Sequence, residues 1–184
     1  MAFSINTFRS TGMPGGGARP NLFECVVAGQ GFTSSQFHYL CKIASIPPST
    51  MGVVEVPYFG RMIKVPGNRT FDNLSVTVIN DENFQVSNIV EEWMNRMNSH
   101  VGNKSDLPST LFAKMTITHF GRAKEEIGGG KWDFTNIFPV ALGEIGLDWG
   151  SNDTIEEFTI DFAYDYWTFF KFINILRRRT FPIN

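Results

Sequence analysis

Residues 68–82 read NRTFDNLSVTVINDE, and this stretch contains the clearest structural signal of the chain. From Phe71 to Ile79 apolar and small polar side chains alternate, with Leu74, Val76 and Val78 on one side. Successive side chains of a strand point to opposite faces of a sheet, so the stretch predicts a half-buried strand. The spacing then changes to steps of three and four residues, which predicts a helix over residues 83–99.

Further strands are predicted on the N-terminal side of this stretch. Residues 22–28 and 37–44 both have the composition of strands. Residues 53–57 and 61–65 predict a hairpin around Phe59-Gly60. Residues 1–18 contain most of a glycine- and proline-rich stretch. We expect a flexible arm there, because the contacts within such a segment do not offset the conformational entropy that it loses on ordering.

On the C-terminal side, residues 111–120 alternate again, and Gly128-Gly129-Gly130 predicts a turn that leads into residues 132–138. Two more strands are predicted at residues 142–149 and 155–167, separated by a polar turn. The pattern therefore predicts about eight strands and one helix, a mainly antiparallel β protein.

Composition and motifs argue against several classes of function. The 184 residues carry a formal charge of −2, whereas sequence-independent nucleic-acid binding needs a basic field. Gly128–Lys131 lacks the spacing of a phosphate-binding loop, and the three histidines are too dispersed for a metal site. We expect no catalytic residue, no cofactor and no metal. Two cysteines do not make a disulfide framework, so we expect reduced packing residues, and no stretch is apolar enough for a signal peptide or for membrane insertion.

The predicted strand over residues 155–167 has two different faces. One is dominated by aromatic side chains, and the other carries Glu157, Asp161 and Asp165. An ordinary solvated face explains the second set. The alternative is the wall of a channel for a polyanion, because an acidic wall repels phosphates and lets DNA slide past.

The basic cluster Arg177-Arg178-Arg179 near the C-terminus also allows more than one interpretation. The cluster is either a solvated tail without a partner or a binding site. As a binding site it would contact an acidic patch on a neighbouring subunit or nucleic acid. Three positive charges neutralise too few phosphates to bind nucleic acid strongly on their own.

Three blocks carry a resemblance to a known family. They are ARPNLFE (residues 18–24), GRMIKVPGNRTFDNLSVTVINDE (60–82) and GEIGLDWGSNDTIEEFTIDFAYDYW (143–167). In this order they resemble the tail tube protein of contractile-tailed (myovirus) bacteriophages, which is related in fold to the tube protein of type VI secretion. The resemblance covers residues 19–167, leaving the arm (1–18) and a C-terminal extension of uncertain structure (168–184) outside.

The resemblance implies a two-sheet antiparallel β-sandwich, barrel-like and flanked by one α-helix. It further implies a structural protein without catalysis, found in the virion tail and assembled in the host cytoplasm. Six copies would form a ring, and stacked rings a hollow tube inside a contractile sheath. Partners would be other copies, the sheath protein, a baseplate initiator and a tail terminator, with DNA only as non-specific cargo.

Alternatives of the same fold are a tube-initiating subunit of the baseplate and a type VI secretion-like tube protein. Alternatives of other classes are a phage lytic enzyme and a DNA-binding protein.

Contacts between rings are expected from a long hairpin, spanning about residues 46–69, and from the arm. A strand edge left unpaired is a liability for a monomer, and closing edges between subunits removes it. The candidate hairpin residues are Tyr58, Phe59, Arg61 and Arg69. Both segments lack a full local core and can order on assembly.

Overall fold

The computed structural model describes residues 4–13, 16–32, 34–102 and 104–170. The strands within them are β1 (Phe23–Ala28), β2 (Cys41–Ser45), β3 (Ser49–Tyr58), β4 (Arg61–Phe71), β5 (Leu74–Ile79), β6 (Ala113–Phe120), β7 (Glu126–Leu142), β8 (Glu157–Ala163) and β9 (Tyr166–Phe170). The helical elements are α1 (Ile5–Thr7), the π-helical turn η1 (Phe8–Gly12), α2 (Ser34–Leu40), α3 (Gln85–Met97) and α4 (Pro108–Leu111).

Two antiparallel sheets share the long strand β7. Sheet 1 contains β1, β6, the first part of β7 and β9, and sheet 2 contains the end of β7 followed by β8, β5 and β2. The strand changes partner within a few residues: Lys131–Thr135 pairs with β9, and Phe138–Leu142 pairs with β8. Between them Asn136 has a φ of 56°, a left-handed conformation that bends the strand from one sheet into the other. The predicted mainly β, two-sheet fold is confirmed.

The hydrophobic core fills the space between the sheets and the helix α3. Leu74, Val76 and Val78 of β5 are fully buried, as the alternation predicts. Their partners on β8 are buried as well, and from α3 the buried apolar side chains are Val86, Val90 and Trp93. The carboxylate Oδ1 of Asp81 accepts the Gln85 N–H at 2.9 Å, which satisfies a free donor at the start of α3. The predicted flanking helix is thus confirmed.

Residues 37–40 form the end of helix α2, so the prediction of a strand over residues 37–44 was wrong in its first half. Phe37 is fully buried and packs edge-on against Phe32, with ring centroids 5.5 Å apart. Leu40, three residues later, packs against the same core. A spacing of three residues places both side chains on one helical face, which the short strand-like composition conceals.

Two predictions on the C-terminal side were also wrong. The glycines 128–130 lie inside β7, and the turn before them is closed by Gly121 N–H donating to the Glu125 carbonyl at 2.7 Å. Residues 143–156 form the loop between β7 and β8, where a strand was predicted for 142–149. The side chains of Leu147 and Trp149 are 84% and 102% exposed, so the core formed by the described residues does not hold this segment extended.

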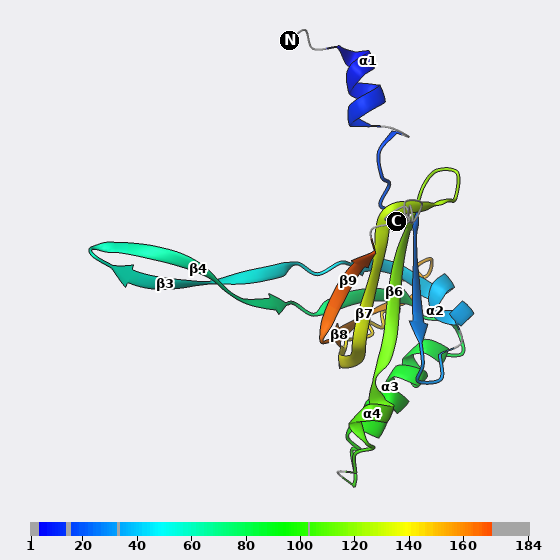
Figure 1. Ribbon diagram of the computed structural model, residues 1–184. Coiled ribbons are helices and arrows are strands. Elements are labelled where there is room, and N and C mark those ends of the chain that lie inside the picture. Colours follow the sequence, from blue (N-terminus) through cyan, green and yellow to red (C-terminus); the bar gives the residue numbers. More distant parts are fainter. Residues whose placement is uncertain (1–3, 14–15, 33, 103, 171–184) are drawn as a thin grey trace, which may run out of the picture.

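The N-terminal segment stands apart from the two sheets (Figure 1). Ile5–Thr7 and Phe8–Gly12 form short helical turns, where the sequence predicts a flexible arm. Every described residue of these turns is exposed. The predicted basic cluster Arg177-Arg178-Arg179 lies outside the described residues.

Candidate assembly surfaces

The hairpin of β3 and β4 projects well away from the two sheets (Figure 1). Its ladder runs from Ser49↔Phe71 at the base to Tyr58↔Arg61 at the tip. The turn residues Phe59 and Gly60 have φ values of 44° and 76°, as a tight two-residue turn of the primed type requires. The hairpin predicted around this dipeptide is confirmed, and it covers nearly the expected span of residues 46–69, with strands longer than the stretches 53–57 and 61–65.

Nearly the whole surface of this hairpin is open to solvent. All ten residues of β3 are exposed, and Phe59 at the tip is 92% exposed. Contiguous exposed apolar surface on this scale marks an interaction site. The large exposed apolar side chains are Met51, Val53, Val54, Val56, Tyr58, Phe59, Met62, Ile63 and Val65.

The structure brings three of the four candidate hairpin residues together. Tyr58 pairs with Arg61 across the ladder, and the rings of Tyr58 and Phe59 meet edge-on at 4.7 Å. Arg69 pairs with Met51 near the base of the hairpin, at the other end of the ladder. The candidate set therefore divides into a tip and a base.

The outward face of sheet 2 carries two of the three candidate acidic residues. On β8, Glu157, Thr159 and Asp161 are half-buried, and the residues between them point into the core. Asp161 pairs with Ser75 of β5, and Thr159 pairs with Thr77. The Glu157 carboxylate forms an ion pair with the Lys42 ammonium on β2. Hydroxyl groups and carboxylates thus dominate this face.

Asp165 does not share this face, because the predicted strand over residues 155–167 is broken. β8 ends at Ala163 and β9 starts at Tyr166, so Asp165 lies in the bend between them. Its Oδ2 accepts a hydrogen bond from Asn136 Nδ2 at 2.6 Å. The break between β8 and β9 lies opposite the point at which β7 passes from one sheet to the other. The alternation of side chains predicted over residues 155–167 therefore does not continue across it.

Sheet 2 has two open edges in the described part of the chain. One edge is β2, which pairs only with β5. The other is the end of β7, residues 138–142, whose ladder with β6 stops at Ile137. Open edges present unpaired backbone donors and acceptors that favour pairing with another chain.

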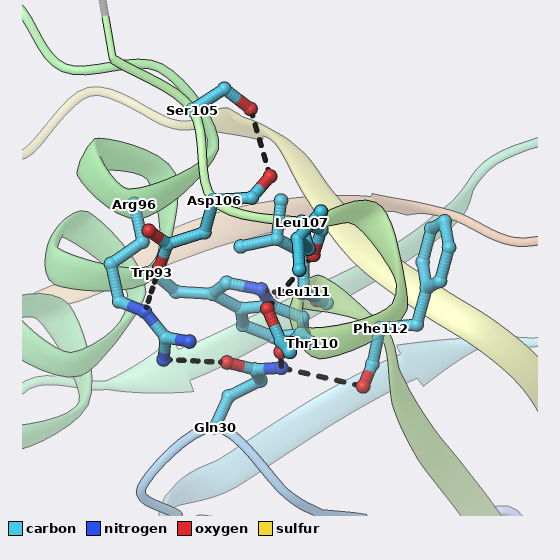
Figure 2. Close-up of polar contacts among 9 residues, drawn as sticks. All are labelled: Gln30, Trp93, Arg96, Ser105, Asp106, Leu107, Thr110, Leu111 and Phe112. Carbon is cyan, nitrogen blue, oxygen red and sulfur yellow. Dashed lines mark hydrogen bonds and ion pairs between the residues drawn. The ribbon is translucent and has the colours of Figure 1, made fainter.

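A network of hydrogen bonds holds the segment between α3 and β6 against the body (Figure 2). Gln30 Nε2 donates to the carbonyls of Thr110 and Phe112 at 2.6 and 3.3 Å. Arg96 Nη1 donates to Gln30 Oε1 at 2.9 Å, and Arg96 Nε donates to Asp106 Oδ2 at 3.1 Å. Sequence reasoning missed this network because Gln30 is more than 60 residues from its partners in the chain. These contacts position a loop rather than a reacting group.

One cavity, with a volume of about 550 Å³, lies between the sheets beside β2. Its lining is mostly apolar, with Phe23, Ile117 and Trp132 among the contributors and His119 and Lys42 as the titratable groups. No carboxylate lines it.

Among the described residues no three His, Cys, Asp or Glu side chains gather into a possible metal site. Both cysteines are free, as the sequence predicts. Burial, together with a hydrogen bond between the Cys25 and Cys41 side chains, raises the pKa of the Cys25 thiol. Within the same residues, no helix combines the length and the apolar character that a membrane crossing requires.

Comparison with known proteins identifies the family of the chain. Residues 7–170 match the model of the phage tail tube protein family. The tail tube protein gp19 of Enterobacteria phage T4 is 31% identical over 156 residues, covering 82% of this chain and 90% of the relative.

Solved structures support the fold. A chain in the tube-terminating cap of the anti-feeding prophage matches with a TM-score of 0.63 and 18% identity, over 84% of this chain and 91% of that one. A chain in the extended sheath–tube complex of an extracellular contractile injection system matches with a TM-score of 0.55 and 19% identity, over 91% and 98%. On the family match and the T4 relative, the chain belongs to the phage tail tube protein family, and it is a structural protein of the virion tail rather than an enzyme.

Proposed function

We propose that this protein forms six-membered rings in which the end of β7 in one subunit pairs with β2 of the next. The observation that carries the proposal is the pair of open edges on sheet 2. The strands β2, β5, β8 and β7 alternate in direction, because every neighbouring pair is antiparallel. Rotation about a ring axis therefore brings β7 and β2 together in antiparallel directions, and the ladder continues without a break.

The number six follows from the resemblance to contractile-tail tube proteins. Four strands from each of six copies give a closed barrel of 24 strands. Barrels of roughly 16–18 strands already leave an aqueous channel, so such a ring encloses a wide lumen. Stacked rings then make a hollow conduit for genome delivery.

The outward face of sheet 2 is the surface that we assign to the lumen. Glu157 and Asp161 stand on this face, and Asp165 lies beyond the end of β8, at the rim of the wall. Six chains of −2 each carry a formal charge of −12 per ring. Repulsion between this wall and DNA phosphates lets the genome pass as non-specific cargo without binding.

The hairpin of β3 and β4 is the element that we assign to contacts between rings. A strand of ten residues spans about 33 Å, which is enough to reach from one ring into the next. Tyr58, Phe59 and Arg61 at the tip make the distant contact, and Arg69 makes a contact near the base.

Further partners follow from the family. We propose that the tube is started by a baseplate initiator, closed by a terminator protein and surrounded by a sheath, with assembly in the host cytoplasm. The matched solved chains come from a tube-terminating cap and a sheath–tube complex, which supports this assignment by fold alone. A tube-initiating subunit of the baseplate is the alternative, and it would stop at a single ring.

Electron microscopy of the purified protein tests the proposal, with one edge variant and one control. Val140→Lys places a charge on the open edge of β7, where the side chain is 48% exposed, so the body still folds. Val101→Lys makes the same chemical change at a side chain in the α3–α4 segment that is 98% exposed.

We expect hollow tubes with six-fold end views from the unmodified protein and from Val101→Lys, and dispersed subunits from Val140→Lys. Single rings from the unmodified protein would favour the tube-initiating alternative. Tubes formed by Val140→Lys would show that the β7 edge is not the junction.

A further inference from the structure

The hairpin and the β7–β8 loop (residues 143–156) lie at opposite ends of sheet 2. The hairpin connects the last residue of β2, Ser45, to the first residue of β5, Leu74. The loop leaves from the other end, where β7 stops at Leu142 and β8 begins at Glu157. The register places Ser45 beside Ser75, and Val78, at the far end of β5, beside Phe158.

Ring closure directs these two ends along the tube axis. When strand edges join around a ring, hydrogen bonds run around the circumference and the strands themselves point along the axis, with a tilt. One end of sheet 2 therefore faces the ring above and the other faces the ring below. Head-to-tail stacking brings the hairpin of one subunit to the β7–β8 loop of another.

The β7–β8 loop presents a large apolar surface that no other described residue covers. Trp149 is 102% exposed, Leu147 is 84% exposed and Ile155 is 68% exposed. A turn fixes the backbone beside Trp149, because Asp148 Oδ1 accepts the Gly150 N–H at 2.9 Å. Tryptophan is enriched among the side chains that dominate binding energy at interfaces.

The charges of the two elements are complementary. Between Ser49 and Phe71 the hairpin carries Glu55, Arg61, Lys64 and Arg69, a net charge of +2. Residues 143–156 carry Glu144, Asp148, Asp153 and Glu156, a net charge of −4 without any basic residue. Lys64 pairs with Glu55 inside the hairpin at 3.6 Å, and among the described residues neither Arg61 nor Arg69 has an acidic partner.

We propose that the hairpin tip of one subunit docks on the β7–β8 loop of a second copy of this chain in the next ring. Tyr58 and Phe59 pack against Leu147 and Trp149, and Arg61 faces the carboxylates of the loop. The inference rests on the proposed stacking of rings and adds to it the surface that receives the hairpin. The contact is heterologous, so it does not saturate and it propagates a tube.

Cross-linking between two variants tests this contact directly. Phe59→Cys and Leu147→Cys chains are purified separately and treated with a short bismaleimide, each alone and as an equimolar mixture. Docking of hairpin on loop predicts a cross-linked dimer in the mixture, with each variant alone at the background of the unmodified protein. A mixture that stays at background overturns the proposal.

A second measurement uses the critical concentration for tube formation, with a matched control. Trp149→Ala is expected to raise it at least about tenfold, as truncating a central interface side chain does. Leu107→Ala, at a side chain 72% exposed in the α3–α4 segment, is expected to leave it unchanged. Equal critical concentrations for Trp149→Ala and the unmodified protein contradict the docking.

Charge exchange separates this inference from the proposed function. Arg61→Glu is expected to weaken stacking, and Asp153→Arg combined with it is expected to restore part of the loss. If rings form and stack but none of these variants affects stacking, the docking inference fails and the tube function stands. If no variant and no unmodified sample forms rings, the ring proposal itself fails, and the cross-link still reports on the contact.

Discussion

Gly52 and Gly67 approach each other so closely across the β3–β4 hairpin that a side chain at either position would push against the backbone of the opposite strand. A Cβ on Gly67 would lie 3.2 Å from the carbonyl carbon and oxygen of Gly52, and a Cβ on Gly52 would lie 3.2 Å from the Asn68 carbonyl oxygen. The ladder shifts register at this place, between Met51 and Val53. Such a bulge increases the local twist, so the glycine pair sets the direction in which the hairpin leaves the body.

Gly67→Ala is therefore expected to impair tube formation without unfolding the protein. The hairpin is exposed, so the free energy of unfolding should change by less than about 0.5 kcal/mol, measured by urea denaturation. Redirecting the hairpin should raise the critical concentration for tubes seen by electron microscopy. Gly102→Ala, in the α3–α4 segment, is the control, because a Cβ there would lie no closer than 3.7 Å to another atom. Identical assembly of both variants would show that the glycine pair does not direct the hairpin.

The network of Gln30 and Arg96 should contribute to stability as a coupled pair. Gln30→Ala removes the donor to the carbonyls of Thr110 and Phe112 and should cost about 0.5–1.5 kcal/mol. Arg96→Ala should cost a similar amount, because its contacts with Gln30 and Asp106 are exposed like those of Gln30. In a double-mutant cycle by urea denaturation we expect a coupling of about 0.5–1 kcal/mol. Additive losses would mean that the two side chains act independently.

Alternation alone predicted the parts of the fold in which one sheet face is buried. Leu74, Val76 and Val78 are buried as the pattern requires, because a half-buried strand has a strict period of two. The helix α3 was found by its period of 3.6 in the same way. Where neither period extends over enough residues, as at Phe37 and Leu40, helix and strand could not be told apart.

The exposed surfaces were harder to predict, because their apolar side chains do not pack into the core of the described residues. Leu147 and Trp149 resemble core positions in the sequence, and this is why a strand was predicted over them. The break before Asp165 depends on β7 passing from one sheet to the other, which is a relationship between distant segments. The hairpin tip was predicted correctly because Phe59-Gly60 is a local turn signal.

The contribution of Tyr164 to the free energy of unfolding is expected to be lost at high pH. Its Oη donates to the Asp72 carbonyl at 2.6 Å, and burial together with the Asp72 charge raises the pKa of Tyr164 to about 12 from an unfolded value of 10.0. The folded state therefore holds the phenol proton more tightly than the unfolded state does. Its stabilising contribution is complete below pH 10 and is lost as the pH rises towards 12.

Tyr164→Phe isolates this contribution from the other titrating groups. At pH 7 the variant should be less stable by about 1 kcal/mol, because it lacks the hydrogen bond to Asp72. Between pH 10 and pH 12 the difference in unfolding free energy should shrink towards zero. A difference that stays constant over this range, measured by urea denaturation at each pH, would contradict the assignment.

Reversing the charge of the proposed lumen wall should make tubes retain DNA. Asp161→Lys changes each chain by two charges, and the side chain stands on the outward face of sheet 2, where it is half-buried and has no ion-pair partner among the described residues. Favourable contacts with phosphates should then appear, and they should weaken steeply with salt because binding releases counterions.

Glu92→Lys, at an exposed position of α3, makes the same change of charge away from sheet 2. Co-sedimentation of tubes with short double-stranded DNA at low and high salt checks the prediction. We expect retention by Asp161→Lys alone. Equal retention by both variants would mean that net charge, rather than the position of Asp161, decides DNA binding, and the lumen assignment of this face would have to be abandoned.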